Sequence, residues 1–420
     1  GFVRDINGHM HHFETHPEAL TVVMDVMYRS APAVQTHLTN LFSFAIKWPR
    51  ATEFIRKSLH DGLLALLSYM LKVDSLATQE AAIGAVTALL QKVSIVADLQ
   101  DFTPTLVDNI LQNHIVDTVT RITTSPDFRI DSKAMFHAVA MYELLSIHPY
   151  THGVLCTPLD IDQSTVHIKG HVPHISAYTQ ALKLLNLLSE KTENMDIYSK
   201  TISSILTFSY YLISAAPKKE VFVENTSLLK SCCRVLCKSR LPELKQETVN
   251  LLHLFAARTT AVAAMLLKNR SYLPFADALI VTSMEDTGLK RAPSDGEEED
   301  ESNMNFSLDL LAFTLAQFFN LSAFVGSTSG AGAIAESAAH MTNTSSDDSD
   351  NVTYCTMLSD AMTEVDIHAS VRELFSRVVH HNSIWQFIVA HLRSSCRQKI
   401  TFAARLIHVL ASYKDLRIMT

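Results

Sequence analysis

Apolar residues recur along this chain at the spacing of an amphipathic helix, and five stretches end in the same arrangement. Each has an apolar residue, two further positions and then two adjacent apolar residues, so one side of a helix carries a continuous stripe. The pairs are Leu89-Leu90, Leu144-Leu145, Leu187-Leu188, Leu254-Phe255 and Val409-Leu410, and the residues three positions before them are Val86, Met141, Leu184, Leu251 and Leu406. The pattern predicts five copies of one helical unit.

The same spacing predicts helices over most of the remaining chain. One segment, Gln79–Val93, is rich in Ala and Gly, which allows neighbouring helices to approach it on more than one side. Few residues break helices, since the chain has only 11 Gly and 12 Pro. The expected segments are Ala19–Arg29, Ala31–Lys47, Ala51–Val73, Gln79–Val93, one that begins at Thr103-Pro104, Asp131–Ile147, Ser176–Glu190, Asp196–Ala215, Thr226–Ser239, Pro242–Arg258, Ala261–Lys268, Val371–Val379, Ile384–Arg393 and Gln398–Tyr413. The chain is therefore expected to be all-α.

The five apolar pairs follow one another at intervals of 55, 43, 67 and 155 residues. These intervals suit a repeat of roughly 40–47 residues with insertions. In Ala82–Leu90, Ala138–Leu145 and Ala181–Leu188, small residues precede a paired-leucine finish, and there the chain resembles the armadillo and HEAT class of helical-repeat proteins. The resemblance implies a right-handed α-solenoid whose concave groove binds extended peptides or partner helices.

One feature of that class does not match this sequence. Armadillo arrays similar to importin-alpha and the catenins present a ladder of Asn and Trp along the groove. This chain has only Trp48 and Trp385, and it places Asn186 and Asn250 at different points of the repeat. The ladder mode of peptide binding is therefore not expected here.

Changes of composition divide the chain into four parts. Residues 1–15 form a polar lead, and residues 16–285 form the helical array, with an irregular insertion at 148–174. Residues 286–306 are expected to be a disordered acidic loop around Asp295–Glu301. The array continues over residues 307–420, interrupted by a low-complexity loop at 326–350.

Charge and cysteine usage favour a cytoplasmic protein that binds other proteins. The net charge is −8 and Lys and Arg are scattered, so no direct nucleic acid partner is expected. No apolar run reaches the length of a membrane span. Six irregularly spaced cysteines indicate a reducing compartment. Six Asn-x-Ser/Thr sequons favour the opposite, secretion, but Asn320 lies inside a further apparent helix. The sequons are at Asn225, Asn269, Asn305, Asn320, Asn343 and Asn351.

The strongest cluster of metal-binding residue types lies in the insertion 148–174. Imidazole and thiolate groups four residues apart can share one helix face, and four of them could hold zinc. The candidates are His148, His152, Cys156, His167, His171 and His174. Pro149, Gly153 and Pro173 interrupt these groups, and the chain has 20 His, so a polar surface loop is the favoured alternative.

Two serines in the expected loops are candidates for phosphorylation. Ser294 and Ser345 each precede an acidic residue by three positions, the spacing that acid-directed kinases favour. A phosphate there would add negative charge that could tune contact with a basic partner. The alternative is that these loops are acidic tethers that only keep the chain solvated.

The sequence motifs favour a binding role over catalysis. The sequence contains no Gly-x-Ser-x-Gly elbow, phosphate-binding Gly-rich loop or His-Glu-x-x-His helix, so no catalytic residue and no cofactor is expected. The first hypothesis is a non-catalytic scaffold or adaptor, a subunit or regulatory segment of a multi-subunit cytoskeletal, trafficking or similar assembly. The alternative is a metal-dependent module or enzyme centred on residues 148–174.

Overall fold

The computed structural model describes residues 18–48, 51–60, 62–157, 175–215, 226–256, 260–286, 306–328, 362–394 and 396–412. Within these residues every regular element is a helix. Their contacts form two compact units. Unit 1 comprises Gly1–Leu185 and Thr207–Ala215, and unit 2 comprises Asn186–Leu206 and Ala216–Thr420. The boundary between the units therefore falls inside helices α11 (Ala177–Glu190) and α12 (Ser199–Ala215).

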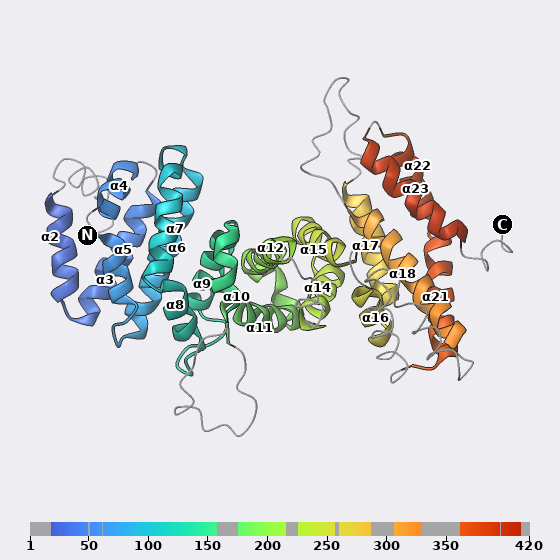
Figure 1. Cartoon of the computed structure of the whole chain (residues 1–420), viewed down its shortest axis with the longest axis horizontal. Coiled ribbons are helices and arrows are strands. Elements are labelled where there is room, and N and C mark those ends of the chain that lie inside the picture. The colour runs from blue at the N-terminus through green and yellow to red at the C-terminus, as the bar shows by residue number, and fades with distance from the viewer. Residues whose placement is uncertain are drawn as a thin grey trace, which may run out of the picture. The chain divides into compact units, whose positions relative to one another are not determined.

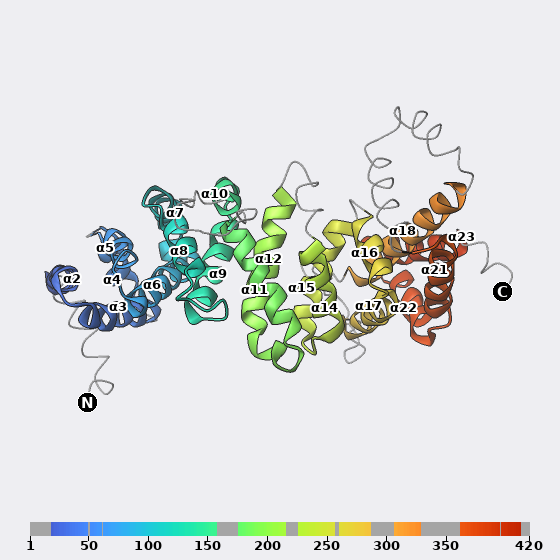
Figure 2. The same ribbon diagram turned by 90° about the horizontal axis from the view of Figure 1, so that it is seen from below.

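Unit 1 is built from short helices in succession, and three longer ones, α3, α6 and α9, follow one another along one layer (Figure 2). Besides its parts of α11 and α12, its helices are α2 (Glu18–Arg29), α3 (Pro32–Lys47), α4 (Thr52–His60), α5 (Leu63–Met70), α6 (Leu76–Ile95), the 3₁₀ helix η2 (Ala97–Phe102), α7 (Thr103–Gln112), α8 (Ile115–Thr124), α9 (Lys133–Ser146), the 3₁₀ helix η3 (Pro149–Thr151) and α10 (His152–Cys156).

Helix α6 is the central helix of that layer, and its small residues explain how it packs. A Cβ atom on Gly84 would lie 3.4 Å from the Cδ2 and Nε2 atoms of His137 in α9. One turn later, the Thr87 hydroxyl lies 2.9 Å from the carbonyl oxygen of His137. On the side of α3, the hydroxyls of Thr36 and Thr78 lie 2.9 Å apart. The predicted close approach on two sides of this helix is confirmed.

Aromatic side chains hold the last segment of unit 1 to the rest of it. Phe208 of α12 is fully buried, and its ring centroid lies 6.0 Å from that of Tyr142 and 5.8 Å from that of Tyr178. The hydroxyls of Tyr142 and Thr120 lie 2.9 Å apart, so the buried phenol has a polar partner. These contacts explain why residues 207–215 belong to unit 1.

Unit 2 is arranged around α18, which packs against α15, α16, α17, α21 and α23. These helices are labelled in Figure 1. Besides the 3₁₀ helix η5 (Thr192–Tyr198) and its parts of α11 and α12, its helices are α14 (Thr226–Lys238), α15 (Pro242–Ala256), α16 (Ala261–Lys268), α17 (Tyr272–Asp286), α18 (Ser307–Thr328), α21 (Glu364–Val379), α22 (Asn382–Leu392) and α23 (Arg397–Ser412).

A buried carboxylate joins three helices of unit 2. Asp309 of α18 has a side chain that is only 3% exposed, and its Oδ2 lies 2.9 Å from the Nε2 of His253 in α15. Its other oxygen pairs with Arg405 of α23, whose guanidinium also lies over the ring of Phe313. The ring of His253 stacks on Phe306 with centroids 4.6 Å apart. We call Asp309, His253 and Arg405 the Asp309 cluster.

The repeated apolar stripe is confirmed in all five copies. The second residue of each pair and the apolar residue four positions before it are at most 4% exposed in every copy; these are Val86 and Leu90, Met141 and Leu145, Leu184 and Leu188, Leu251 and Phe255, and Leu406 and Leu410. Fully burying such a side chain contributes roughly 1.5–3 kcal/mol. Helices that bury one stripe against the helices before and after them make this fold an α-solenoid with armadillo/HEAT-like repeats.

Several element boundaries differ from the sequence prediction. The single helix expected over Ala51–Val73 is wrong, because the chain turns at Gly62, where φ is +92°, and two helices form instead. The insertion expected to be irregular from residue 148 is helical over Pro149–Cys156. Helices α8 and α17 were not among the predicted segments. Helix α18 extends to Thr328, two residues beyond the expected start of the low-complexity loop.

Among the helices that the structure describes, none is by itself long and apolar enough to cross a bilayer. Two bent pairs of helices meet that criterion together, by length and composition only: Leu76–Ile95 with Ala97–Gln112, and Pro242–Ala256 with Ala261–Lys268.

Candidate functional site

The metal-site hypothesis divides between described and undescribed residues. His148, His152 and Cys156 lie around η3 and α10, whereas His167, His171 and His174 lie outside the described residues. The Nε2 of His152 lies 2.7 Å from the carbonyl oxygen of Ser146, and the ring of His148 lies 5.7 Å from that of Tyr150. No group of three or more His, Cys, Asp or Glu in the described part of the chain is arranged to hold a metal ion.

The thiol of Cys156 is partly buried. Burial raises its pKa to about 11, so without a bound metal this thiol is protonated near neutral pH. The cysteines of α14 share this property, because burial raises the pKa of Cys232 to about 12 and that of Cys233 well above its usual value. Cys232 and Cys233 therefore behave as buried apolar side chains, as the sequence predicted for α14.

Two Ser–His contacts resemble parts of a catalytic pair. In α21 the Nδ1 of His380 lies 2.8 Å from the carbonyl oxygen of Ser376 and 3.4 Å from its hydroxyl. A carbonyl oxygen can only accept, so Nδ1 carries the proton and is not a base toward the serine. His380 instead closes the C-terminal end of the helix.

The second contact joins Ser322 of α18 and His368 of α21, whose Oγ and Nδ1 atoms are 2.5 Å apart. Ser322 is buried within the helix packing of unit 2, so the pair holds two helices together rather than facing a substrate.

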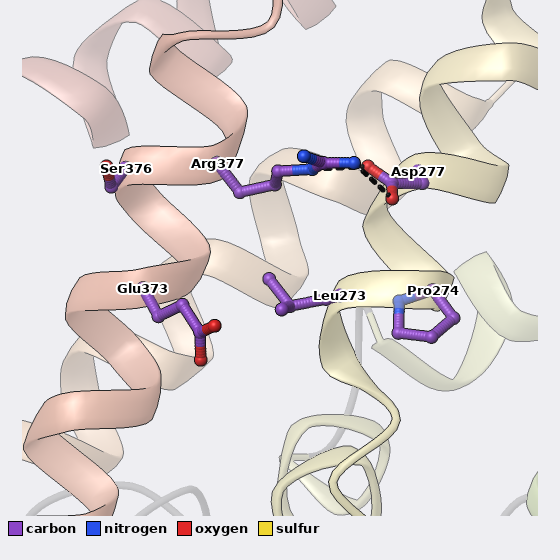
Figure 3. A pocket seen from close by; sticks show the side chains of 6 residues that line it. All are labelled: Leu273, Pro274, Asp277, Glu373, Ser376 and Arg377. Carbon is purple, nitrogen blue, oxygen red and sulfur yellow. Dashed lines mark hydrogen bonds and ion pairs between the residues drawn. The ribbon is translucent and has the colours of Figure 1, made fainter.

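A groove between α17 and α21 is the best candidate for a binding site (Figure 3). It has a volume of about 550 Å³, within the range of roughly 300–1,000 Å³ that is usual for ligand pockets. Leu273, Pro274 and Asp277 come from α17, and Glu373, Ser376 and Arg377 come from α21. We call this site the α17–α21 groove. Its wall on α17 is apolar near Leu273 and Pro274, and charged groups face each other across it.

An ion pair crosses the groove between its two helices. The Nε and Nη2 atoms of Arg377 donate to the two carboxylate oxygens of Asp277, at 3.0 and 2.9 Å. These two parallel hydrogen bonds, together with the charge of Asp277, raise the pKa of the Arg377 guanidinium. The Arg377 side chain is 55% exposed and that of Asp277 is 36% exposed, so water reaches both groups. The pair is therefore accessible to a partner.

A second polar contact lies at the other side of the groove. The hydroxyl of Tyr272, the first residue of α17, donates to Glu373 Oε2 at 2.9 Å. Burial, the main cause, raises the pKa of this phenol, so it remains a donor near neutral pH. The bond fixes the Glu373 carboxylate beside the apolar wall. The groove thus offers one fixed carboxylate, one paired guanidinium, one serine hydroxyl and an apolar surface.

Exposed apolar side chains continue on the next helix. Trp385, Val389 and Leu392 of α22 are exposed and lie at positions i, i+4 and i+7, so they share one helix face. The indole Nε1 of Trp385 donates to the carbonyl oxygen of Val379 at 2.9 Å, which fixes the ring at the end of α21. We call these three residues the α22 row. Helix α22 packs against both α17 and α21.

Sequence reasoning missed the groove because its two walls lie about a hundred residues apart in the chain. Asp277 and Arg377 are separated by 100 positions, and neither carries a motif. The α22 row did leave a signal, since three apolar residues at helical spacing accompany the buried stripe of the same helix. Ser294, Ser345 and the acidic segment Asp295–Glu301 lie outside the described residues.

Comparisons with known proteins find similarity only at the level of structure. No family model matches the chain, and no curated protein matches it. Among solved structures, the chain is similar to a mutant of the karyopherin Kap121p, with 13% sequence identity and a TM-score of 0.27. It is also similar to Kap121p bound to the extreme C-terminus of the protein phosphatase Cdc14p, with 13% identity and a TM-score of 0.24. Both matches cover 96% of this chain, which spans 42% and 41% of the length of the two karyopherin chains.

Proposed function

We propose that this chain is a non-catalytic interaction scaffold, a cytoplasmic subunit or regulatory segment of a larger assembly, that binds an extended peptide or a helix of another protein. The observation that carries the proposal is the open α17–α21 groove, whose charged pair crosses between two helices and stays in contact with water. Catalytic sites gain from excluding water, whereas the polar edge of a protein interface is accessible to solvent.

The residue types around the groove support protein recognition. Trp, Tyr and Arg are the residues that most often dominate the binding energy of interfaces. In unit 2, Arg377 lines the groove and exposed Trp385 lies in the α22 row of a neighbouring helix, whereas Tyr272 is buried and only supports Glu373. Hydrogen bonds hold Glu373, through Tyr272, and Trp385 in place, so a partner would order few additional side chains.

The test places a photoreactive amino acid at position 273 or 385 of the full chain and identifies cross-linked proteins in an extract of the source cells. We expect the same protein at both positions, and we expect its purified form to bind the chain directly. Changing Glu373→Lys together with Trp385→Ala should weaken that binding by about tenfold or more.

The matched control is Gln386→Ala, a change at the exposed neighbour of Trp385 on the same helix, which should leave binding unchanged. If neither position cross-links a protein above the level found with the photoreactive residue at position 386, the proposal is wrong. It is equally wrong if the purified partner binds the double variant and the original chain alike.

A further inference from the structure

Helix α3 of unit 1 carries a second apolar row on the side that its own packing does not use. Val34, Leu41 and Phe44 are between 38% and 46% exposed, and half-buried Trp48 follows at the C-terminal end of the helix. The rings of Phe44 and Trp48 lie 6.5 Å apart. We call these four residues the α3 row. It extends over about 21 Å, at a rise of about 1.5 Å per residue.

The spacing of this row is that of a coiled-coil seam. Residues 34, 41 and 48 are seven apart, and exposed His37 and Phe44 occupy the intermediate positions of the same heptads. The face of α3 that packs in unit 1 is centred on a different row, Gln35, Thr39, Phe42 and Ile46, and it also includes Ala45. At about 100° per residue, the two rows lie roughly 150° apart around the helix. The α3 row is therefore a largely separate face, which meets the packed face at Ala45, four residues after Leu41.

Lys47 and Lys92 bring positive charge to the C-terminal end of the row, and the charge of Lys133 acts on the same neighbouring residue as that of Lys47. Lys47 is the last residue of α3, and Lys133 is the first residue of α9; both are exposed. Besides burial, which is the main cause, the charges of these two lysines lower the pKa of His137, so both act on the same place in unit 1. Lys92 of α6 donates to the carbonyl oxygen of Trp48 at 2.8 Å, which brings a third amino group to that end.

We propose that the α3 row is the docking face for an acidic amphipathic helix of another protein. Apolar residues of the partner at heptad spacing would pack between Val34, Leu41, Phe44 and Trp48, and its carboxylates would lie near Lys47 and Lys133. This inference rests on the proposed role as a scaffold, but it concerns unit 1 and a surface separate from the α17–α21 groove. It names the partner by its charge and by its helical form.

The test measures binding of synthetic peptides to the full chain by fluorescence anisotropy. The probe has three heptads with Leu at the first and fourth positions and Glu at the flanking positions. A matched peptide has Lys in place of Glu. We expect the acidic peptide to bind at least about tenfold more tightly at low salt, and we expect this preference to shrink as salt rises.

Two variants on unit 1 separate the apolar and the electrostatic contributions. Leu41→Ser with Phe44→Ser should weaken the acidic peptide by about tenfold or more. Lys47→Glu with Lys133→Glu should remove the preference for the acidic peptide and leave the apolar contact. All four changes are at exposed positions, so the variants should keep the circular dichroism spectrum and thermal transition of the original chain.

Trp385→Ala, in unit 2, is the control that should not change peptide binding. If Trp385→Ala weakens binding of the peptide while the α3 variants do not, the peptide binds unit 2. The inference about α3 is then wrong, although the scaffold proposal survives. Equal binding of both peptides would also overturn it. Two further results would overturn the inference, because the α3 row would then be occupied by this chain itself. One is peptide binding that appears only after removal of residues 1–17, and the other is self-association of the chain that Leu41→Ser abolishes.

Discussion

The Asp309 cluster should contribute more to the stability of unit 2 than the exposed Asp277–Arg377 ion pair of the groove. Replacing Asp309 by Ala leaves His253 and Arg405 without their shared acceptor. Removing one partner of a buried ion pair costs roughly 3–5 kcal/mol. The Arg405 side chain is 37% exposed and that of His253 is 21% exposed, so water replaces part of the lost interaction.

We therefore expect Asp309→Ala to lower the free energy of unfolding of unit 2 by about 3 kcal/mol, near the lower limit of that range. Asp309→Asn keeps one acceptor oxygen and loses the charge, and it should cost about 2 kcal/mol, close to one hydrogen bond to a charged group. The matched control, Asp277→Asn, breaks the exposed pair with Arg377 and should cost no more than about 1 kcal/mol.

The two tryptophans make unit 2 measurable by itself. Trp48 lies in unit 1 and Trp385 lies in unit 2, and the chain has no other. In a Trp48→Phe background, the fluorescence of Trp385 during urea unfolding reports on unit 2 alone. This separation is needed because a chain with two units does not have to unfold in one step.

Two results would refute the reasoning. One is a cost of Asp309→Ala no larger than that of Asp277→Asn. The other comes from a double-mutant cycle with Arg405→Met. If Asp309→Ala costs as much in the Arg405→Met background as in the original chain, the carboxylate and the guanidinium are not coupled.

Three further predictions concern helix packing and titration. Gly84→Ala should stabilise unit 1 by up to about 1 kcal/mol and raise its thermal midpoint slightly, because Ala has the higher helix propensity and its Cβ would lie at contact distance, 3.4 Å, from His137. The larger Gly84→Val should instead lower the free energy of unfolding by about 1–3 kcal/mol, and equal effects of the two changes would contradict this. Burial, with the charges of Lys47 and Lys133, lowers the pKa of His137, so as the pH falls the unfolded chain binds a proton at this residue before the folded chain does. The free energy of unfolding of unit 1 should therefore decrease as the pH falls through 6.5, as followed by Trp48 fluorescence in a Trp385→Phe background. His137→Gln should reduce that decrease. Cys232 and Cys233 should resist iodoacetamide at pH 8 in the folded chain, as judged by peptide mass spectrometry, and alkylation as fast as in urea would show that the α14 core is open.

The solenoid could be predicted from the sequence because each helix must bury an apolar stripe against its neighbours. Leu90 and Leu188 are buried for the same reason, at the same place in their repeats. The turn at Gly62 was missed because apolar spacing continues through it, although the preceding Asp61 makes an Asp-Gly pair that favours a turn. A period alone does not show where one helix ends and the next begins.

The groove and the Asp309 cluster depend on contacts that spacing does not encode. His253, Asp309 and Arg405 come from three helices, with 56 and 96 positions between the members of each pair. Each taken alone is an ordinary polar or charged residue on a helix, and only the packing of α15, α18 and α23 brings them together. The exposed faces of α3 and α22 are recognisable from the sequence, because both helices carry more apolar residues than one buried stripe requires.

The order of segments along the chain limits how this protein can be divided. Residues 186–206 belong to unit 2 but precede residues 207–215, which belong to unit 1. A break after Leu185 separates Phe208 from Tyr142, and a break after Ala215 separates Asn186 from Arg234, whose Nη1 lies 3.1 Å from the Asn186 Oδ1. No single cleavage therefore yields both halves intact, and fragments made for expression have to overlap: 1–215 for the first and 186–420 for the second.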